Sequence, residues 1–223
     1  GELMKPTGLA SDGKTLWVSD TKMGYGRIVA FDLADGSPLN YLVPSKNQCA
    51  SCHATNHTTG ELLPIGIKAR HLDRSTKIYN KNQLDHWAER GWLTHVSGGH
   101  TPNAIRGDTS QTLDHQARSY LDINCGHCHN AQGAADTSGL LLDYEQHPAS
   151  ALGRCKPPIA AGRGSGGHLY SIVPGQAEHS ILSFRLATND PGMMMPELGR
   201  SLVHEEGLEI INQWINSMDG QCL

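Results

Sequence analysis

The sequence predicts a mainly α-helical protein with extensive loops, arranged as two lobes that follow a small N-terminal β-hairpin. Three observations support this fold class. Apolar residues recur at helical spacing in the second half of the chain, for example at Leu113, Ala117 and Leu121. The 25 glycines and 11 prolines among 223 residues indicate many loops and turns. Runs of β-prone residues with turn-forming neighbours gather before residue 40.

Residues 1–39 are expected to form a β-hairpin extension. Leu16–Val18 and Arg27–Phe31 are rich in β-branched, aromatic and aliphatic residues, and the segments 11–14 and 34–37 are typical of turns. This stretch resembles one blade of a sugar-lactonase-like β-propeller. A propeller needs at least four blades and the sequence holds one copy, so we predict a hairpin or a small sheet.

Residues 40–107 are expected to form a first, abbreviated lobe. It contains the sequence Cys-Ala-Ser-Cys-His at positions 49–53. A helix is predicted over 83–90, with Gly91 as its terminator. The glycine-rich segment 97–102 is predicted to be a loop.

Residues 108–223 are expected to form a complete second lobe. Asp108 and Gln111 have the spacing of a capping box, which predicts a helix that runs directly into Cys125. A final helix is predicted near the C-terminus, with the acidic pair 205–206 in its first turn, where the helix dipole favours negative charge. Its apolar stripe consists of Leu208, Ile211, Trp214, Ile215 and Met218.

Composition excludes two classes of partner. The formal net charge is -4 and the pI is about 6.3, so a concentrated basic face for nucleic acid is not expected. No apolar run approaches the eighteen or more residues of a membrane span, and no membrane span is predicted.

The segments 49–53 and 125–129 both have the pattern Cys-x-x-Cys-His. Two thiols three positions apart can form thioethers with the two vinyl groups of one haem, and the following histidine is then held under the iron. We therefore predict two covalently bound haem c groups. The residues that attach them are Cys49, Cys52, Cys125 and Cys128, and the proximal iron ligands are His53 and His129. The competing interpretation is a four-cysteine zinc site, which leaves both trailing histidines without a role.

Three further segments carry a resemblance to a known family. Tyr41 to Cys49, Arg118 to Cys125 and Met194 to Arg200 are similar to a bacterial family of exported dihaem c-type cytochromes, over roughly residues 40–223. The order helix, Cys-x-x-Cys-His, long loop, Met-Pro and final helix in 108–223 resembles a class I cytochrome c domain. The resemblance implies two cytochrome c-like lobes, a periplasmic or extracellular location and electron transfer, and it names no partner.

The resemblance also implies a sixth ligand for the second haem. Met193, Met194 and Met195 precede Pro196, about 66 residues after His129, in the region where class I domains carry their distal methionine. Met195 is the predicted ligand because the residue before proline adopts an extended conformation. Core packing is the competing role for a methionine in this run. Methionine–histidine ligation predicts a positive reduction potential.

The sixth ligand of the first haem is left open by the sequence. No methionine lies between His53 and Met193. By the same resemblance the distal loop falls near residues 94–102, so His100 is the preferred candidate and His95 the alternative. Weaker options are His71, His86, Met4, Met23 and an open site, and His57 is too close to His53.

The remaining cysteines, Cys155 and Cys222, predict a disulfide, because an even remainder in an exported protein favours pairing. Two free thiols are the alternative. Four arginines could pair with haem propionates or lie on the surface: Arg70, Arg74, Arg163 and Arg185.

Two functions fit these features. The preferred one is transfer of single electrons between redox partner proteins, with an acidic surface suited to transient docking. The alternative is a dihaem oxidoreductase of the peroxidase type, with an open or exchangeable site at the first haem. It is motivated by the missing methionine partner of His53.

Overall fold

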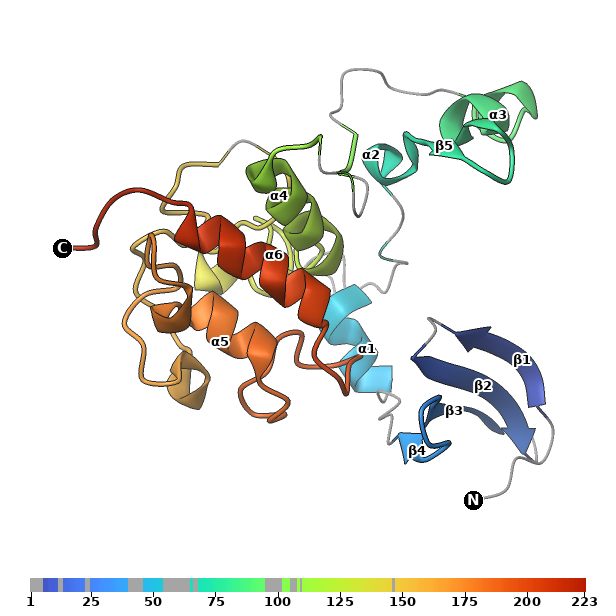
Figure 1. Cartoon of the computed structure of the whole chain (residues 1–223), viewed down its shortest axis with the longest axis horizontal. Helices are drawn as coiled ribbons and strands as arrows, with labels where there is room; N and C mark the ends of the chain where they lie inside the picture. Colours follow the sequence, from blue (N-terminus) through green and yellow to red (C-terminus); the bar gives the residue numbers. More distant parts are fainter. Residues whose placement is uncertain are drawn as a thin grey trace.

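The computed structural model describes residues 6–11, 14–22, 25–39, 46–53, 65, 68–94, 102–104, 108, 110–145 and 147–223. Within these segments the chain is rich in helices, has two small antiparallel sheets and forms no barrel (Figure 1). No helix among them combines the length and the apolar character needed to cross a bilayer.

The N-terminal segment folds as a four-stranded antiparallel sheet in the order β1-β2-β3-β4. Its strands are β1 (Pro6–Ser11), β2 (Thr15–Lys22), β3 (Tyr25–Asp32) and β4 (Pro38–Leu39). Val18 lies in the central part of the sheet, opposite Leu9 on one side and Val29 on the other, and is buried. Of the hairpin and the small sheet that we predicted for this segment, the structure thus shows the small sheet.

A tight turn leads into the fourth strand. The Asp32 carboxylate accepts a hydrogen bond from the Ala34 amide at 2.7 Å, and the Asp35 carboxylate accepts one from the Ser37 amide at 2.8 Å. Gly36 has a φ of 72°, which glycine adopts without strain. The turn residues were recognised in the sequence, whereas the two-residue strand after them is too short to leave a periodic pattern.

Residues 68–94 form a small unit of helices and a strand pair, which is shown in green in Figure 1. Its elements are α2 (Ala69–Leu72), β5 (Ser75–Thr76), β6 (Lys81–Asn82) and α3 (Gln83–Glu89). The Asn82 side chain caps α3 by accepting a hydrogen bond from the Leu84 amide at 2.9 Å. Gly91, with a φ of 71°, follows the end of the helix, so both the predicted helix and its terminator are confirmed.

The main core lies between α4 (Leu113–Asn124), α5 (Ile181–Ala187) and α6 (Glu205–Asn216) (Figure 1). A Cβ added at Gly207 of α6 would lie 2.3 Å from the Tyr120 ring of α4, so glycine permits this close helix contact. The predicted final helix and its acidic first turn are confirmed. The buried cluster consists of Ala117, Leu121, Leu142, Ile172, Ala177, Leu186, Ile211, Trp214 and Ile215.

The start of α4 differs from the prediction. The Thr112 hydroxyl caps the helix by accepting a hydrogen bond from the His115 amide at 3.2 Å. The Asp108 carboxylate instead accepts hydrogen bonds from the amide and hydroxyl of Ser110. The predicted capping box of Asp108 and Gln111 is therefore wrong, because Asp108 closes a local turn before the helix begins.

Short 3-10 helices and loops connect α4, α5 and α6. The 3-10 helices are η1 (Asp136–Ser138), η2 (Gly162–Ser165) and η3 (Ala177–His179). The predicted disulfide between Cys155 and Cys222 is confirmed, with a Cα–Cα distance of 5.1 Å. It closes a loop with a sequence separation of 67, for which chain entropy predicts about 4 kcal/mol of stabilisation. The disulfide ties the C-terminus to the loop that precedes η2.

Candidate functional site

The second Cys-x-x-Cys-His motif begins where α4 ends. The Cys125 amide still donates to the Leu121 carbonyl at 2.8 Å, and the His129 amide donates to the Cys125 carbonyl at 2.8 Å. Gly126 packs tightly at this point, since an added Cβ would lie 2.8 Å from the Asp122 carbonyl oxygen. The end of α4 and this turn therefore fix the positions of the two cysteines and of His129.

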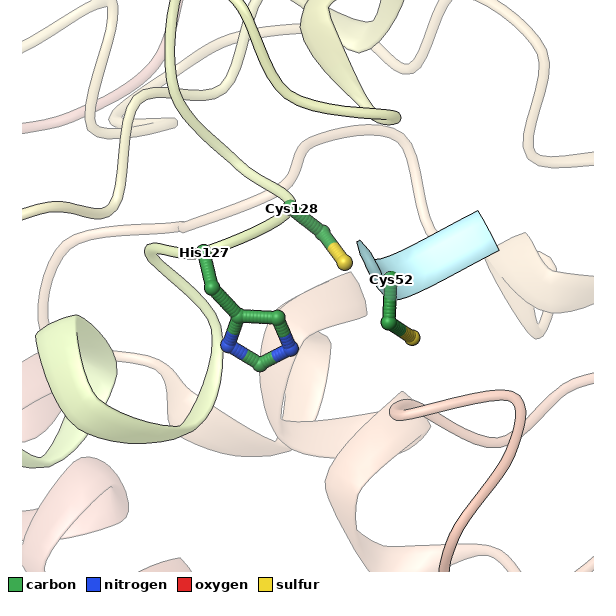
Figure 2. A group of neighbouring side chains, drawn as sticks. All are labelled: Cys52, His127 and Cys128. Carbon is green, nitrogen blue, oxygen red and sulfur yellow. The ribbon is translucent and has the colours of Figure 1, made fainter. Parts of the chain in front are cut away.

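The first motif lies on α1 (Lys46–His53), and α1 brings it against the second motif. Figure 2 shows Cys52 of α1 beside Cys128 and His127. The two sulfur atoms and a ring nitrogen of His127 all lie within 4.8 Å of one another. The Cys128 thiol also donates to the Ser51 carbonyl, with a sulfur–oxygen distance of 3.8 Å. The two motifs, which lie 76 positions apart in the sequence, thus meet at their cysteines.

A cavity of about 350 Å³ lies next to the second motif. His129 and Met195 both line it, and this volume falls within the range of small-molecule sites, about 300–1,000 Å³. Arg185 supplies a cationic group to its wall. Its apolar wall is formed by Leu140, Leu142, Ile159, Ile181, Leu182 and Leu186.

A second cavity of about 280 Å³ adjoins the first and extends to α1. Both motifs contribute to its lining, with Ser51 and Cys52 from the first and Cys128 from the second. Five residues line both cavities: Cys125, His129, Ala135, Met195 and Glu197.

His129 has the surroundings of a neutral ligand histidine. Burial, with a smaller effect of the Arg185 charge, lowers its pKa to about 4, so the imidazole is uncharged at neutral pH. A hydrogen bond to the Leu140 backbone opposes this shift, and the Ser138 hydroxyl lies 3.4 Å from Nδ1. Ligand histidines commonly use one ring nitrogen for such a contact, which leaves the other for a metal.

The thiols of the second motif are protonated at neutral pH. Burial raises the pKa of Cys125 to about 12. Burial, and then the neighbouring Cys52, raise the pKa of Cys128 to about 12. Burial also lowers the pKa of His127, so its imidazole is uncharged beside the two sulfur atoms. His127 therefore lies at the site, although the sequence predicted no ligand role for it.

Two arginines hold the loop that carries Met195. The Met195 amide donates to the Arg185 carbonyl at 2.9 Å, and Nε of Arg185 donates to the Met193 carbonyl at 2.9 Å. Arg200 donates to the carbonyls of Arg185 and Thr188. Because these bonds join the loop to α5, Met195 is held at the wall of the cavity.

The neighbouring methionine has a different role. Met194 is buried, which matches the core packing that competes with ligation in this run. Of the four arginines considered for propionates, Arg70 pairs with Asp122, Arg163 pairs with Asp190, and Arg74 is exposed. Arg185 lines the cavity beside Met195, 3.7 Å from the Glu197 carboxylate. Arg185 is thus the arginine among these that the structure places at the candidate cofactor site.

The predicted sixth ligand of the first haem, His100 or His95, lies outside the described residues. Met4, Met23 and His57 lie outside them as well. The two weaker candidates that are described have other partners. Nε2 of His71 lies 2.9 Å from the Asp122 carboxylate, and the His86 ring stacks on Tyr79 with a centroid distance of 3.9 Å.

Asp122 organises a charged cluster that no pattern in the sequence indicated. Its side chain is fully buried, and it binds Lys68 at 2.6 Å, Arg70 at 2.6 Å and His71 at 2.9 Å. It also accepts the Tyr144 amide at 3.1 Å, and the Arg70 guanidinium lies 3.5 Å from the centre of the Tyr144 ring. Asp122 therefore joins α2 to α4, three residues before Cys125.

The pKa of Asp122 reflects this balance of burial and pairing. Burial by itself would raise the pKa, but the hydrogen bonds from Lys68, His71 and Arg70 lower it to about 2. The carboxylate thus stays charged inside the protein. The helical spacing of Arg118 and Asp122 on α4 does not reveal this cluster, because the Arg118 guanidinium donates instead to the carbonyls of Asp143 and Glu145.

The residues present fit a haem at the second motif, on three observations of this structure. A neutral histidine and Met195 line one cavity, its wall is largely apolar, and a half-buried arginine lies beside them. At the first motif the described residues supply the two cysteines and His53 on one helix.

Comparison of the chain with protein-family models, with curated proteins and with solved structures found no match.

Proposed function

We propose that the chain is a dihaem c-type cytochrome that transfers single electrons between redox partner proteins. The observation that carries the proposal is the cavity beside the second motif, which His129 and Met195 line together. Histidine and methionine are the axial pair of cytochromes c, and this pair raises the reduction potential. The bound iron would supply reversible one-electron chemistry.

Each proposed contact uses a group of this chain. Cys49 and Cys52 would hold the first haem, with His53 as its proximal ligand and His100, or alternatively His95, as its distal one. The second haem would be held by Cys125, Cys128, His129 and Met195. Arg185 would pair with a propionate, since it is the cation on the cavity wall.

The remaining parts of the proposal concern architecture and location. The chain would comprise an N-terminal extension, residues 1–39, and two cytochrome c-like lobes, residues 40–107 and 108–223. The disulfide between Cys155 and Cys222 supports a periplasmic or extracellular location, because disulfides persist in oxidising compartments. The formal net charge of -4 suits transient docking to a redox partner.

A second candidate is a structural metal site made by Cys52, Cys128 and His127. The ligand atoms of these three residues already lie within 4.8 Å of one another, and thiolates with histidine are typical zinc ligands. This grouping differs from the four-cysteine site considered from the sequence. It does not use His53, His129 or Met195. It therefore leaves the lining of the cavity beside the second motif by His129 and Met195 unexplained.

Optical and EPR spectra of the oxidised and reduced protein test electron transfer against the enzyme alternative. We expect both haems to be low-spin and neither to bind carbon monoxide, cyanide or peroxide. A haem that binds these ligands would replace the proposal with the peroxidase-type oxidoreductase. The Met195→Ala variant should convert the second haem to a high-spin or otherwise altered spectrum and lower its potential. The matched Met193→Ala variant, in the same loop, should change neither the spectrum nor the reduction potential of the second haem.

A further inference from the structure

Two histidines outside the Cys-x-x-Cys-His motifs line a third cavity. Its volume is about 470 Å³, and His168 and His179 both contribute to its wall. The ring centres of the two imidazoles lie 6.3 Å apart, with an angle of 69° between the ring planes. No residue lines both this cavity and either of the two beside the second motif. The two histidines therefore form a cluster that the proposed function does not use.

The backbone holds these two histidines beside each other. Tyr170 and Ser180 form a parallel bridge, which aligns the segments that carry His168 and His179. The His168 ring also lies edge-on to Phe184, with a centroid distance of 5.7 Å, and this contact orients its imidazole. Two positions that are eleven residues apart in the sequence thus bring their imidazoles to one cavity.

The C-terminal segment supplies a further, covalently fixed part of the wall. Gln221 and Cys222 line the cavity, and Cys222 is bonded to Cys155. The Tyr170 hydroxyl donates to the Leu223 carbonyl at 2.7 Å, which joins the segment to the strip of chain that follows His168. The cavity is therefore built from three parts of the chain that are tied together by a disulfide and by backbone contacts.

The separation of the rings suits two ligands of one metal ion. A metal ion lies about 2.1 Å from a ligating imidazole nitrogen, and hence about 3 Å from the ring centre. Two imidazoles on one ion therefore have centres no more than about 6 Å apart. The observed 6.3 Å is close to this distance, and the side chain of His179 is 60% exposed, so a small rotation of His179 brings the rings to it.

The charges around the cavity favour a cation. Among the described residues that line it, none is a lysine or an arginine. The Glu178 carboxylate lies 3.8 Å from Nε2 of His179, where it adds negative charge beside the imidazole. Gln176 and Gln221 contribute side chains with an oxygen acceptor to the lining.

We propose that His168 and His179 together bind one divalent first-row transition-metal ion, of the class of Zn²⁺ and Cu²⁺. Imidazole nitrogens suit these metals, and water molecules in the cavity complete the coordination. The proposal is independent of the proposed function, because it uses no residue of either Cys-x-x-Cys-His motif. It also differs from the grouping of Cys52, Cys128 and His127 in both ligands and place.

Isothermal titration calorimetry of the mature protein with Zn²⁺ tests the proposal. We expect His168→Ala and His179→Ala each to weaken binding at this site by about tenfold or more, since even the outer partners of metal ligands are worth about 10–100-fold in affinity. His204→Ala is the matched control and should bind Zn²⁺ as the wild type does. His204 is a half-exposed histidine with Nε2 3.6 Å from the Glu206 carboxylate, and it resembles His179 in both respects.

The outcomes of this titration separate the two metal groupings. The proposal is overturned if the wild type binds no Zn²⁺, or if its binding survives both substitutions. Binding that persists in His168→Ala and His179→Ala and is lost in Cys52→Ala belongs to the cysteine grouping instead. Far-UV circular dichroism of each variant checks that the fold is retained.

EPR spectroscopy with one equivalent of Cu²⁺ gives a second test that needs no variant. Two ligating imidazoles should produce nitrogen couplings from two nuclei in the copper signal of the wild type. A copper signal with coupling to one nitrogen or to none would contradict the paired site, whatever the variants show.

Discussion

Replacement of Asp122 by asparagine should destabilise the protein by about 3 kcal/mol at neutral pH. The lowered pKa of about 2, against 3.8 for an ordinary aspartate, corresponds to about 2 kcal/mol of preference for the charged form in the folded state. The Asp122→Asn variant also leaves the buried Arg70 guanidinium without its charged partner, and breaking a buried pair costs about 3–5 kcal/mol. Urea denaturation of the mature protein, followed by far-UV circular dichroism, measures the difference.

The pH dependence of this difference has a defined sign. Because the folded-state pKa of Asp122 lies below its unfolded value, the charge contributes fully above about pH 4 and is lost as pH falls towards about 2. The difference in the free energy of unfolding between wild type and Asp122→Asn should therefore become smaller as pH falls from about 4 to about 2. The exposed Asp219→Asn is the control and should stay within about 0.5 kcal/mol of wild type. An Asp122→Asn variant as stable as this control would refute the assigned role.

Three further predictions concern stability. Leu121→Ala, at a fully buried position of α4, should lower the free energy of unfolding by about 2–5 kcal/mol, and a loss below 1 kcal/mol would contradict the assigned core. The Cys155→Ala/Cys222→Ala variant should lose about 2–4 kcal/mol in the same urea assay, whereas unchanged stability would show that the disulfide constrains little. Gly126→Ala should lose about 1–3 kcal/mol, since its Cβ would lie 2.9 Å from Cα of Asp143, and a variant with wild-type stability and haem content would show that the turn has room for a methyl group.

The sequence predicted local features and the disulfide well, and the other long-range contacts poorly. The stripe through Ile211, Trp214 and Ile215 predicted α6, because helical periodicity is a local signal. The start of α4 was wrong because Asp108 and Thr112 are both good capping residues, and only the structure shows that Asp108 bonds to Ser110. The two cysteines that remained after the motifs sufficed to predict their pairing.

At the candidate site, too, the local motifs could be predicted from the sequence and the long-range contacts could not. The spacing of Cys-x-x-Cys-His identified the candidate cofactor residues without any knowledge of the fold. The cluster of Asp122 and the contact between Cys52 and Cys128 involve partners more than 50 positions apart, and neither has a periodic signature. Such contacts depend on how α1 and α2 pack against α4, which local patterns do not encode.

The haem content of the mature chain tests the central claim most directly. The protein is produced in a bacterial host that attaches haem c, and intact-mass spectrometry is combined with haem absorbance. We expect two covalent haems in the wild type and one in each of the variants Cys49→Ala/Cys52→Ala and Cys125→Ala/Cys128→Ala. A wild-type chain that carries no haem, and instead binds one zinc ion that is lost on Cys52→Ala or His127→Ala substitution, would contradict the account.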